Sequence, residues 1–280
     1  MEFPLRIAIL DMYNGASNQG MRSIKEILAR ENYKHANQEL EFDVFDTRGN
    51  GEIPTLGYDI YISTGGPGDP FDGQQQKWET DYFNLLDKLY DINQQQDGSS
   101  KKFVFFICHS FQLMCRHYEL GTVTKRKSTS FGIFPMHCTE EGKEDLVFQG
   151  LNDPYYGVDS RDYQVIEPNY ASMGQLGANI LSLEKIREHV PYERALMAIR
   201  ISDEFFGTQF HPEADPIGMK VHFMTTERRK QVIDNHGEAK YLDMLEHLND
   251  PDKILLTNHT ILPNFIGHAV GQLRGDSVWV

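Results

Sequence analysis

Over roughly the first 120 residues, stretches with a strand-like pattern of hydrophobic positions alternate with stretches of helical spacing. Short, nearly continuous apolar runs such as "LRIAIL" (5–10) and "FVFFI" (103–107) are typical of strands buried on both faces of a parallel sheet. "LEFDVFD" (40–46) and "YDIYIST" (58–64) indicate two more strands. Between the runs, apolar residues recur at helical spacing, as in residues 75–90. The alternation predicts an α/β fold with an open, mostly parallel sheet and helices on both faces.

The pattern changes after residue 121. Short β-type runs separated by turn residues predict further strands, and "ALMAIRI" followed by "FFGTQF" predicts a hairpin. From about residue 216 the apolar spacing is helical again. We therefore expect an α/β domain over residues 1–215 and a helical C-terminal extension over residues 216–280, packed on the core or at an interface. The β-type runs are 131–138, 146–149, 155–158, 163–166 and 179–183.

The composition and net charge of the chain argue against some classes of binding partner. With 41 acidic against 27 basic side chains, the formal net charge is −14, which argues against binding nucleic acid or an anionic membrane. The basic stretch "TKRKS" (124–128) is expected to be a solvated loop. No apolar stretch reaches the ~18 residues that span a bilayer, and "MEFPLRIAIL" lacks the features of a signal peptide, so a cytoplasmic location is expected. Three cysteines without paired spacing, and histidines without ligand spacing, predict no disulfide framework, metal site or cofactor.

A cysteine ends the most apolar run of the chain. In "FFICHSFQLM", Cys108 follows the predicted strand at 103–107 and precedes a segment with helical spacing. A nucleophile on a sharp turn between strand and helix would lie above the carboxyl end of the sheet, where open α/β folds place their sites. The positive N-terminal end of the helix would favour the reactive thiolate. The alternative is that Cys108 is a small buried hydrophobic residue.

Two other stretches place candidate chemistry at predicted strand ends. "ISTGGPGDP" (62–70) has two glycines after a strand, where uncovered peptide N–H groups can hold an oxyanion. In "GTQFHPEAD" (207–215), His211 and Glu213 are two residues apart, so an extended backbone would place both side chains on one face. A histidine oriented by a carboxylate can take up a cysteine proton and return it to a leaving amine. Taken singly, the first stretch also fits a glycine–proline turn, and the second a surface turn with a chance acid.

Together, the three stretches resemble the class I (triad) glutamine amidotransferases, the family that includes the amidotransferase part of GMP synthase. "FICHSFQ" matches most of the family motif G-(I/V)-C-x-G-x-Q, and "STGGPGDP" is close to S-G-G-P. The third motif, Q-F-H-P-E, is identical in this sequence. The resemblance covers about residues 5–214 and implies a flavodoxin-like arrangement of the sheet.

The resemblance also implies roles for individual residues. Cys108 would be the nucleophile, His211 the base and acid, and Glu213 the group that orients the imidazole. Peptide N–H groups would form the oxyanion hole, and residues from the first two motifs and from a later β-type segment would hold the substrate. These residues are Gly66 and His109 for the oxyanion hole, and Gly65, Gln112, Ser160 and Asp162 for the substrate.

Two family glycines are replaced in this chain, by Phe106 and by Ser110. Glycines at these positions let strand and helix approach closely around a strained turn, so the backbone must make room for the phenylalanine. The side chain of His109 is expected to point away from Cys108. The departures keep two alternatives open: a gamma-glutamyl hydrolase or homoserine acyltransferase-like enzyme with the same triad, and a non-catalytic module that retains the fold.

The activity implied by the resemblance is hydrolysis of the glutamine side-chain amide through a cysteine thioester. The ammonia would pass to a synthase, as in GMP synthase, and no cofactor is implied. The chain contains neither an "SGGxDS"-type pyrophosphate loop nor a Walker motif, so the acceptor of ammonia is expected in another polypeptide. Residues 216–280 would pack on the core or form a homodimer contact, with docking of the synthase as the alternative.

Overall fold

A single mixed sheet runs through the protein in its computed structural model, which describes residues 3–34, 39–95, 100–186 and 193–275. Nine strands in these ranges form the sheet, in the order β2-β1-β3-β4-β9-β8-β7-β5-β6. The first five of this order pair in parallel and the rest pair antiparallel. The strands are β1 (Leu5–Asp11), β2 (Leu40–Asp46), β3 (Ile60–Ser63), β4 (Phe103–Ile107), β5 (Gly121–Cys138), β6 (Tyr155–Pro168), β7 (Asn179–Glu184), β8 (Leu196–Arg200) and β9 (Phe205–Thr208).

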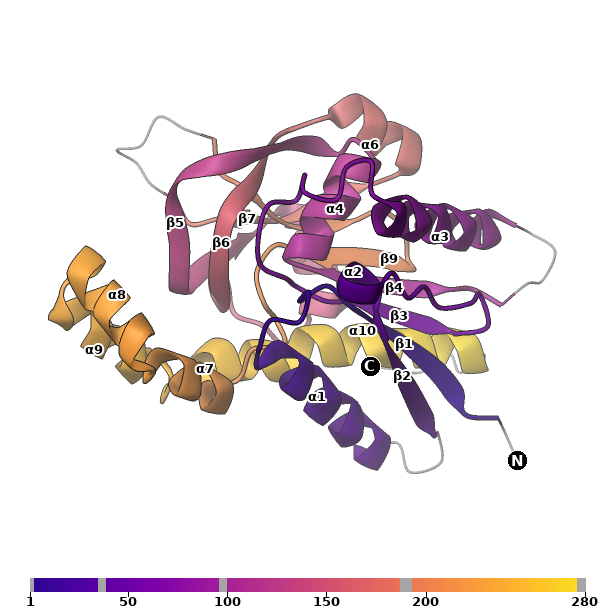
Figure 1. Cartoon of the computed structure of the whole chain (residues 1–280). Helices are drawn as coiled ribbons and strands as arrows, with labels where there is room; N and C mark the ends of the chain where they lie inside the picture. Colours follow the sequence, from indigo (N-terminus) through magenta and orange to yellow (C-terminus); the bar gives the residue numbers. More distant parts are fainter. Residues whose placement is uncertain (1–2, 35–38, 96–99, 187–192, 276–280) are drawn as a thin grey trace.

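Helices cover both faces of the parallel half, which confirms the predicted α/β fold (Figure 1). Side chains alternate along β1, so that Ile7 and Ile9 enter one buried cluster while Ala8 and Leu10 enter another. Helices α1 (Gly20–Lys34) and α10 (Leu256–Arg274) cover the first face, and α3 (Lys77–Gln94) and α4 (His109–His117) cover the second.

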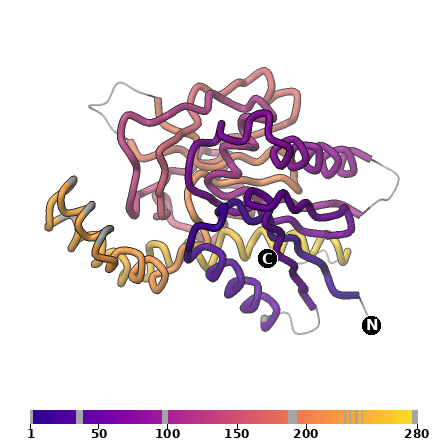
Figure 2. Tube along the Cα trace, in the orientation of Figure 1, coloured from indigo at the N-terminus to yellow at the C-terminus, as the bar shows by residue number. Residues whose placement is uncertain are grey.

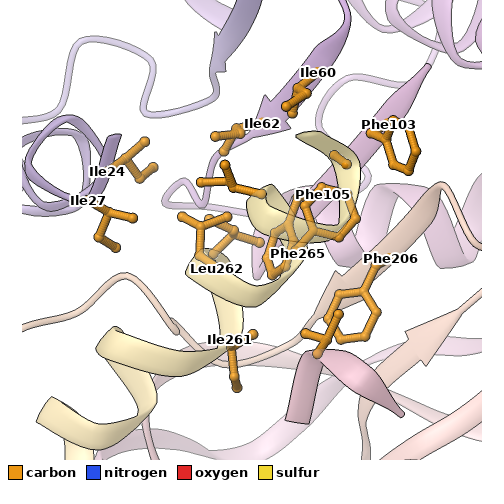
Figure 3. Close-up of a cluster of buried hydrophobic side chains, with 14 of the residues drawn as sticks. Ile24, Ile27, Ile60, Ile62, Phe103, Phe105, Phe206, Ile261, Leu262 and Phe265 are labelled. Atoms are coloured by element: carbon orange, nitrogen blue, oxygen red, sulfur yellow. The ribbon is translucent and has the colours of Figure 1, made fainter. Parts of the chain in front are cut away.

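The last helix belongs to the main hydrophobic core. Ile261, Leu262 and Phe265 of α10 are buried against the strands and against α1 (Figure 3). The phenylalanine ring lies 5.1 Å from that of Phe105 in β4, edge to face, which is a favourable arrangement for two aromatic rings. The chain therefore returns to the sheet after leaving it at residue 216.

Between β9 and α10 the chain forms the α-helices α7, α8 and α9, which extend away from the sheet (Figure 2). They have their own hydrophobic cluster, which includes Phe223 and Met244 and touches the sheet through Ile133 and Val158. The division at residue 215 stays a prediction, and residues 276–280 of the predicted extension lie outside the described residues. The remaining helices are α2 (Thr47–Asn50), α5 (Glu140–Glu144), α6 (Tyr170–Leu176), α7 (Pro216–Phe223), α8 (Thr226–His236), α9 (Glu238–His247), the short 3₁₀ helix η1 (Leu146–Phe148) and the π-helical turn η2 (Pro251–Leu255).

Two local expectations differ from the structure. The basic stretch 124–128 is part of strand β5, because Arg126 turns inward to an ion pair with Glu184 at 3.1 Å and a hydrogen bond to Gln164 at 2.8 Å. Residues 146–148 form a 3₁₀ turn instead of a strand, since the Asp145 carboxylate caps the Val147 N–H at 2.9 Å. Among the described residues, no helix has both the length and the apolar character needed to cross a membrane.

Candidate active site

Cys108 lies at the sharp junction between β4 and α4. Its backbone has φ 47° and ψ −95°, a left-handed region that favours glycine and that other residues occupy only under constraint. The residue is also the N-cap of α4, so the sulfur lies next to the positive end of that helix. Only 4% of Cys108 is exposed. The strand–turn–helix geometry expected for a nucleophile is therefore present.

His211 and Glu213 come to the same place from the segment after β9. The backbone N–H of His211 donates to Val158 O of β6 at 2.8 Å, and its Nδ1 lies 2.8 Å from Glu213 Oε1. Burial alone would lower the pKa of His211. The negative charges of Glu213 and Cys108, with hydrogen bonds to both side chains, outweigh burial and raise that pKa well above its usual value. The surroundings of the imidazole therefore favour its protonated form beside the cysteine.

The glycine turn after β3 packs closely against both Cys108 and His211. A Cβ on Gly65 would lie 2.8 Å from Cε1 of His211 and 3.5 Å from Cβ of Cys108. A Cβ on Gly66 would lie 2.1 Å from the carbonyl oxygen of Met12. Arg48 holds the turn from behind, since its guanidinium donates to the carbonyl oxygens of Met12 and Pro67. Only glycine lets the backbone approach the cysteine and the histidine this closely.

The two replaced glycines are accommodated in different ways. Phe106 is fully buried, and its partner in the next strand is Gly207, where a Cβ would lie 3.2 Å from Cβ of Phe106 and 3.0 Å from the ring of Phe111. The absence of a side chain at Gly207 thus leaves room for Phe106. Ser110 adds a hydroxyl that hydrogen-bonds to Ser63 Oγ at 2.8 Å and to the Thr64 carbonyl oxygen. It joins the start of α4 to the turn that carries the paired glycines.

The side chain of His109 is buried at the start of α4. Burial, together with the positive charges of Arg48 and Arg116, lowers its pKa to about 3, so the ring is neutral near pH 7. Its backbone N–H belongs to the first turn of α4, where N–H groups have no partner within the helix.

The predicted substrate residues separate into two groups. Gln112 is buried, and its Nε2 donates to Gln209 Oε1 at 3.2 Å and to Tyr163 O at 3.3 Å. The carbonyl oxygen of Ser160 lies 3.9 Å from the Cys108 sulfur as a hydrogen-bond acceptor. Asp162 is exposed further along β6, where it accepts a hydrogen bond from Thr129, and it does not line the cavity at the site.

A cavity of about 310 Å³ adjoins the His211–Glu213 pair. Its walls come from the glycine turn, from the loop between β1 and α1, from β5 and β6, and from α7. The wall residues include Tyr13, Asn18, Phe131, Ser160, Met219 and His222.

Three side chains around the site were not expected from the sequence. Gln209, within "QFHPE", donates from Nε2 to the Cys108 sulfur at 3.8 Å. The buried ring of Tyr13 lines the cavity, and its hydroxyl occupies the space that a Cβ on Gly20 would need. Asn258 of α10 donates to the Glu213 carbonyl oxygen at 2.7 Å. Only Gln209 lies in a recognisable motif; the other two are brought in by the fold.

Several solved structures are similar to this chain over nearly their whole length. A glutamine amidotransferase from Thermotoga maritima shares 15% identity and a TM-score of 0.63, with 96% of this chain and 99% of that chain covered. A putative GMP synthase subunit from Thermoplasma acidophilum shares 14% identity and a TM-score of 0.56, with 99% and 100% covered. The glutaminase domain of CTPS from Trypanosoma brucei, with bound acivicin, shares 13% identity and a TM-score of 0.56, with 99% and 96% covered.

At these identities the structures show a common fold. A search of curated proteins found no match. The family model for "Glutamine amidotransferase class-I" matches residues 20–231, most of the chain. This chain therefore belongs to the class I glutamine amidotransferase family.

Proposed function

We propose that this protein hydrolyses the side-chain amide of glutamine through a thioester on Cys108. The observation that carries the proposal is the buried His211–Glu213 pair, 2.8 Å between Nδ1 and Oε1, placed against a cysteine on a strained strand–helix junction. A structural cysteine needs neither the strained backbone nor a charged imidazole beside it. Membership of the family supports the same activity.

The proposed reaction forms a thioester on Cys108 and then hydrolyses it. The Cys108 thiolate attacks the amide carbon, and the peptide N–H groups of Gly66 and His109 hold the oxyanion. His211 gives its proton to the departing ammonia, and the thioester remains on the sulfur. The neutral imidazole then removes a proton from water, hydroxide attacks the thioester, and glutamate leaves as the thiolate–imidazolium pair is restored. Loss of one oxyanion donor would cost about 3 kcal/mol in the barrier.

The proposal extends to the fate of the ammonia. We place its consumption on a separate synthase in the cytoplasm, in an arrangement of the GMP synthase kind, with a homodimer as the alternative quaternary state. The similarity to a CTPS glutaminase domain and to a putative GMP synthase subunit supports a synthase partner. In the proposed arrangement Gly65, Gln112 and Ser160 contact the glutamine, whereas Asp162 lies outside the residues that line the cavity.

A glutaminase assay tests the activity directly. Wild-type protein should release glutamate alone or with candidate synthases, with an equal amount of ammonia when no synthase consumes it, and Cys108→Ala should fall to background. The control is Cys138→Ala, which removes a partly buried thiol in β5, outside the residues that line the cavity, and should leave the rate unchanged. A chloroketone analogue of glutamine should label Cys108. Absence of both glutamate release and labelling in all these mixtures would contradict the proposal.

A gamma-glutamyl amide is the second candidate substrate. The cavity is lined by His211, which protonates the leaving group, and continues to Phe131 and Met219. A substituent on the amide nitrogen would therefore have space on the leaving-group side. If gamma-glutamyl peptides are cleaved with a higher kcat/KM than glutamine, this hydrolase activity replaces the glutaminase; homoserine with acyl-CoA completes the panel for the acyltransferase-like alternative.

A further inference from the structure

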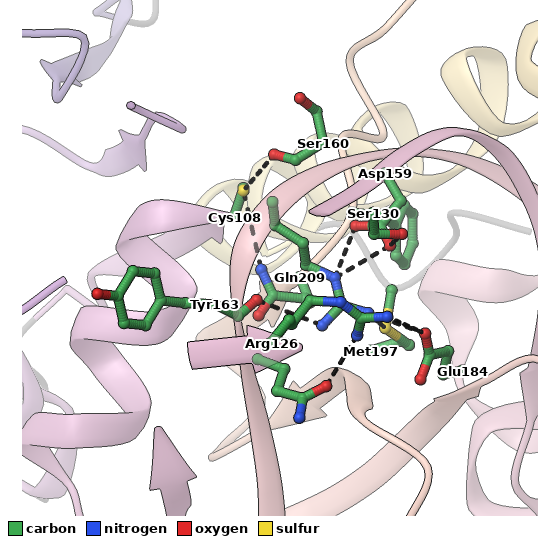
Figure 4. A network of polar contacts seen from close by, with 12 residues as sticks. Cys108, Arg126, Ser130, Asp159, Ser160, Tyr163, Glu184, Met197 and Gln209 are labelled. Carbon is green, nitrogen blue, oxygen red and sulfur yellow. Dashed lines mark hydrogen bonds and ion pairs between the residues drawn. The ribbon is translucent and has the colours of Figure 1, made fainter. Parts of the chain in front are cut away.

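The Cys108 sulfur has a hydrogen-bond donor besides its histidine. Nε2 of Gln209 points at Sγ from 3.8 Å (Figure 4). Gln209 directly follows β9 and is fully buried, and its backbone N–H is fixed by a bond to Met197 O at 2.8 Å. A buried amide held at both its backbone and its side chain has little freedom to turn away.

A second glutamine decides which end of the Gln209 amide faces the sulfur. Nε2 of Gln112 donates to Gln209 Oε1 at 3.2 Å and also to the backbone carbonyl of Tyr163 at 3.3 Å. A carbonyl accepts only, so the group of Gln112 that faces Tyr163 must be its NH₂. The same NH₂ also faces the Gln209 amide, so the end of Gln209 that it faces must be the accepting oxygen. The NH₂ of Gln209 is therefore the end that faces Cys108.

We infer that Gln209 is a catalytic residue that stabilises the Cys108 thiolate, and that Gln112 is the positioning residue that orients it. The inference rests on the proposed role of Cys108 as nucleophile. It gives Gln112 a task inside the protein, through Gln209, in addition to any contact with the substrate. Neither glutamine carries a charge, so the pair favours the anion without an ion pair that would compete with His211.

The physical reason is the difference between thiol and thiolate as acceptors. An N–H donor lowers the free energy of an anionic sulfur more than that of a neutral thiol, and most strongly where water is excluded. Other groups also face the sulfur: His211 and Glu213 after β9, Tyr13 from the β1–α1 loop, and the carbonyl oxygen of Ser160. The carboxylate and the carbonyl oxygen oppose the anion, and the Gln209 donor offsets them.

The test is the pH dependence of alkylation of Cys108 by iodoacetamide, followed on its own peptide by mass spectrometry. Gln209→Met removes the donor with little change of size, and should move the alkylation profile to higher pH by about one pH unit. Gln209→Glu keeps the shape but places a carboxylate at the sulfur, so its shift should be larger. Gln112→Met should shift the profile in the same direction by less. The control is Gln175→Met on the exposed surface of α6, which should match wild type.

The outcomes separate this inference from the proposed function. A Gln209→Glu or Gln209→Met profile that coincides with wild type, in folded protein by circular dichroism, overturns the role of Gln209. An unchanged Gln112→Met profile overturns the positioning role alone. Alkylation needs no glutamine, so a shifted profile in an enzyme that hydrolyses no glutamine supports the inference while the proposed function fails. The reverse pattern, glutamine hydrolysis with unshifted profiles, does the opposite.

Discussion

The environment of His211 sets the charge state of the site at neutral pH. Its side chain is 16% exposed and that of Glu213 only 1% exposed, so the two charges interact with little screening by water. One carboxylate oxygen of Glu213 binds the imidazole; the other is buried and has no hydrogen-bond partner among the described residues. A carboxylate in this position is costly to bury, and the compensation is a histidine that stays protonated next to the nucleophile.

Glu213→Gln should move the alkaline limb of the kcat/KM profile for glutamine to lower pH. The carboxylate raises the pKa of His211, so the imidazolium is lost earlier when an amide replaces the acid. The maximal rate should also fall, by about 10- to 100-fold, because the imidazole loses its orienting acceptor. The measurement is the pH profile of glutamate release, with Glu41→Gln on the exposed side of β2 as the control. An unmoved alkaline limb would exclude this electrostatic role for Glu213.

At the scale of elements, β4 and β9 pack together because a large side chain on one strand lies opposite a glycine on the other, which we call the exchange of volume. The phenylalanine at position 106 needs space that the opposite residue, Gly207, leaves free. The ring also lies 5.9 Å from that of Phe205, so the strand pair is packed by aromatic contact on one face of the sheet. The site turn then follows directly from a rigid, fully buried strand.

Gly207→Val should destabilise the protein by about 1–3 kcal/mol, because a branched side chain would overpack the space shared by Phe106 and Phe111. Urea unfolding measures the change. In the Phe106→Gly background the same substitution should cost less, since the Phe106 Cβ that it meets at 3.2 Å is gone. The control is Gly174→Ala in α6, where nothing lies within 4 Å of the added Cβ, and it should be neutral or stabilising by up to about 1 kcal/mol. Equal costs in both backgrounds would rule out the exchange of volume.

At the scale of the whole molecule, the C-terminal region has two different relations to the core. Helices α7–α9 pack mainly on one another and on Ile133 of β5 and Val158 of β6, and α7 lines the cavity. Helix α10 instead covers a face of the parallel half, and its Asn258 holds the backbone of Glu213. The carboxylate proposed to orient His211 is thus supported by a residue 45 positions further along the chain.

A chain ending at residue 215 should not fold to a stable protein. Each buried side chain of the α10 type contributes about 1.5–3 kcal/mol, and the total stability of a domain is about 5–15 kcal/mol. Loss of Ile261, Leu262, Phe265, Ile266, Ala269 and Val270 would remove an amount of that order. Soluble yield and thermal unfolding should show aggregation or a non-cooperative transition in the shorter chain, and one cooperative transition in the full chain. A cooperative transition at the wild-type temperature in the shorter chain would contradict this role of α10.

The sequence by itself determined the elements and the chemistry that lie close together along the chain. The apolar runs predicted β1 to β4 with small errors at their ends, because burial on both faces requires continuous hydrophobicity over a few residues. Each of the three motifs lies at the carboxyl end of a strand, and these strand ends share one edge of the sheet. Cys108, Gly65 and His211 therefore come together, as their positions after the strands predict. The roles assigned to them stay predictions.

Only the tertiary structure decided the features that depend on residues distant in the chain. The space for Phe106 comes from Gly207, about 100 positions away, and nothing in either segment indicates the other. The stretch at 124–128, where local polarity predicts a loop, belongs to β5, and its Arg126 pairs with the distant Glu184. The orientation of Gln209 depends on Gln112. The local pattern of polar and apolar residues indicates whether a segment is exposed or buried. It does not indicate which atoms of distant segments pack against it, and these outcomes depend on those contacts.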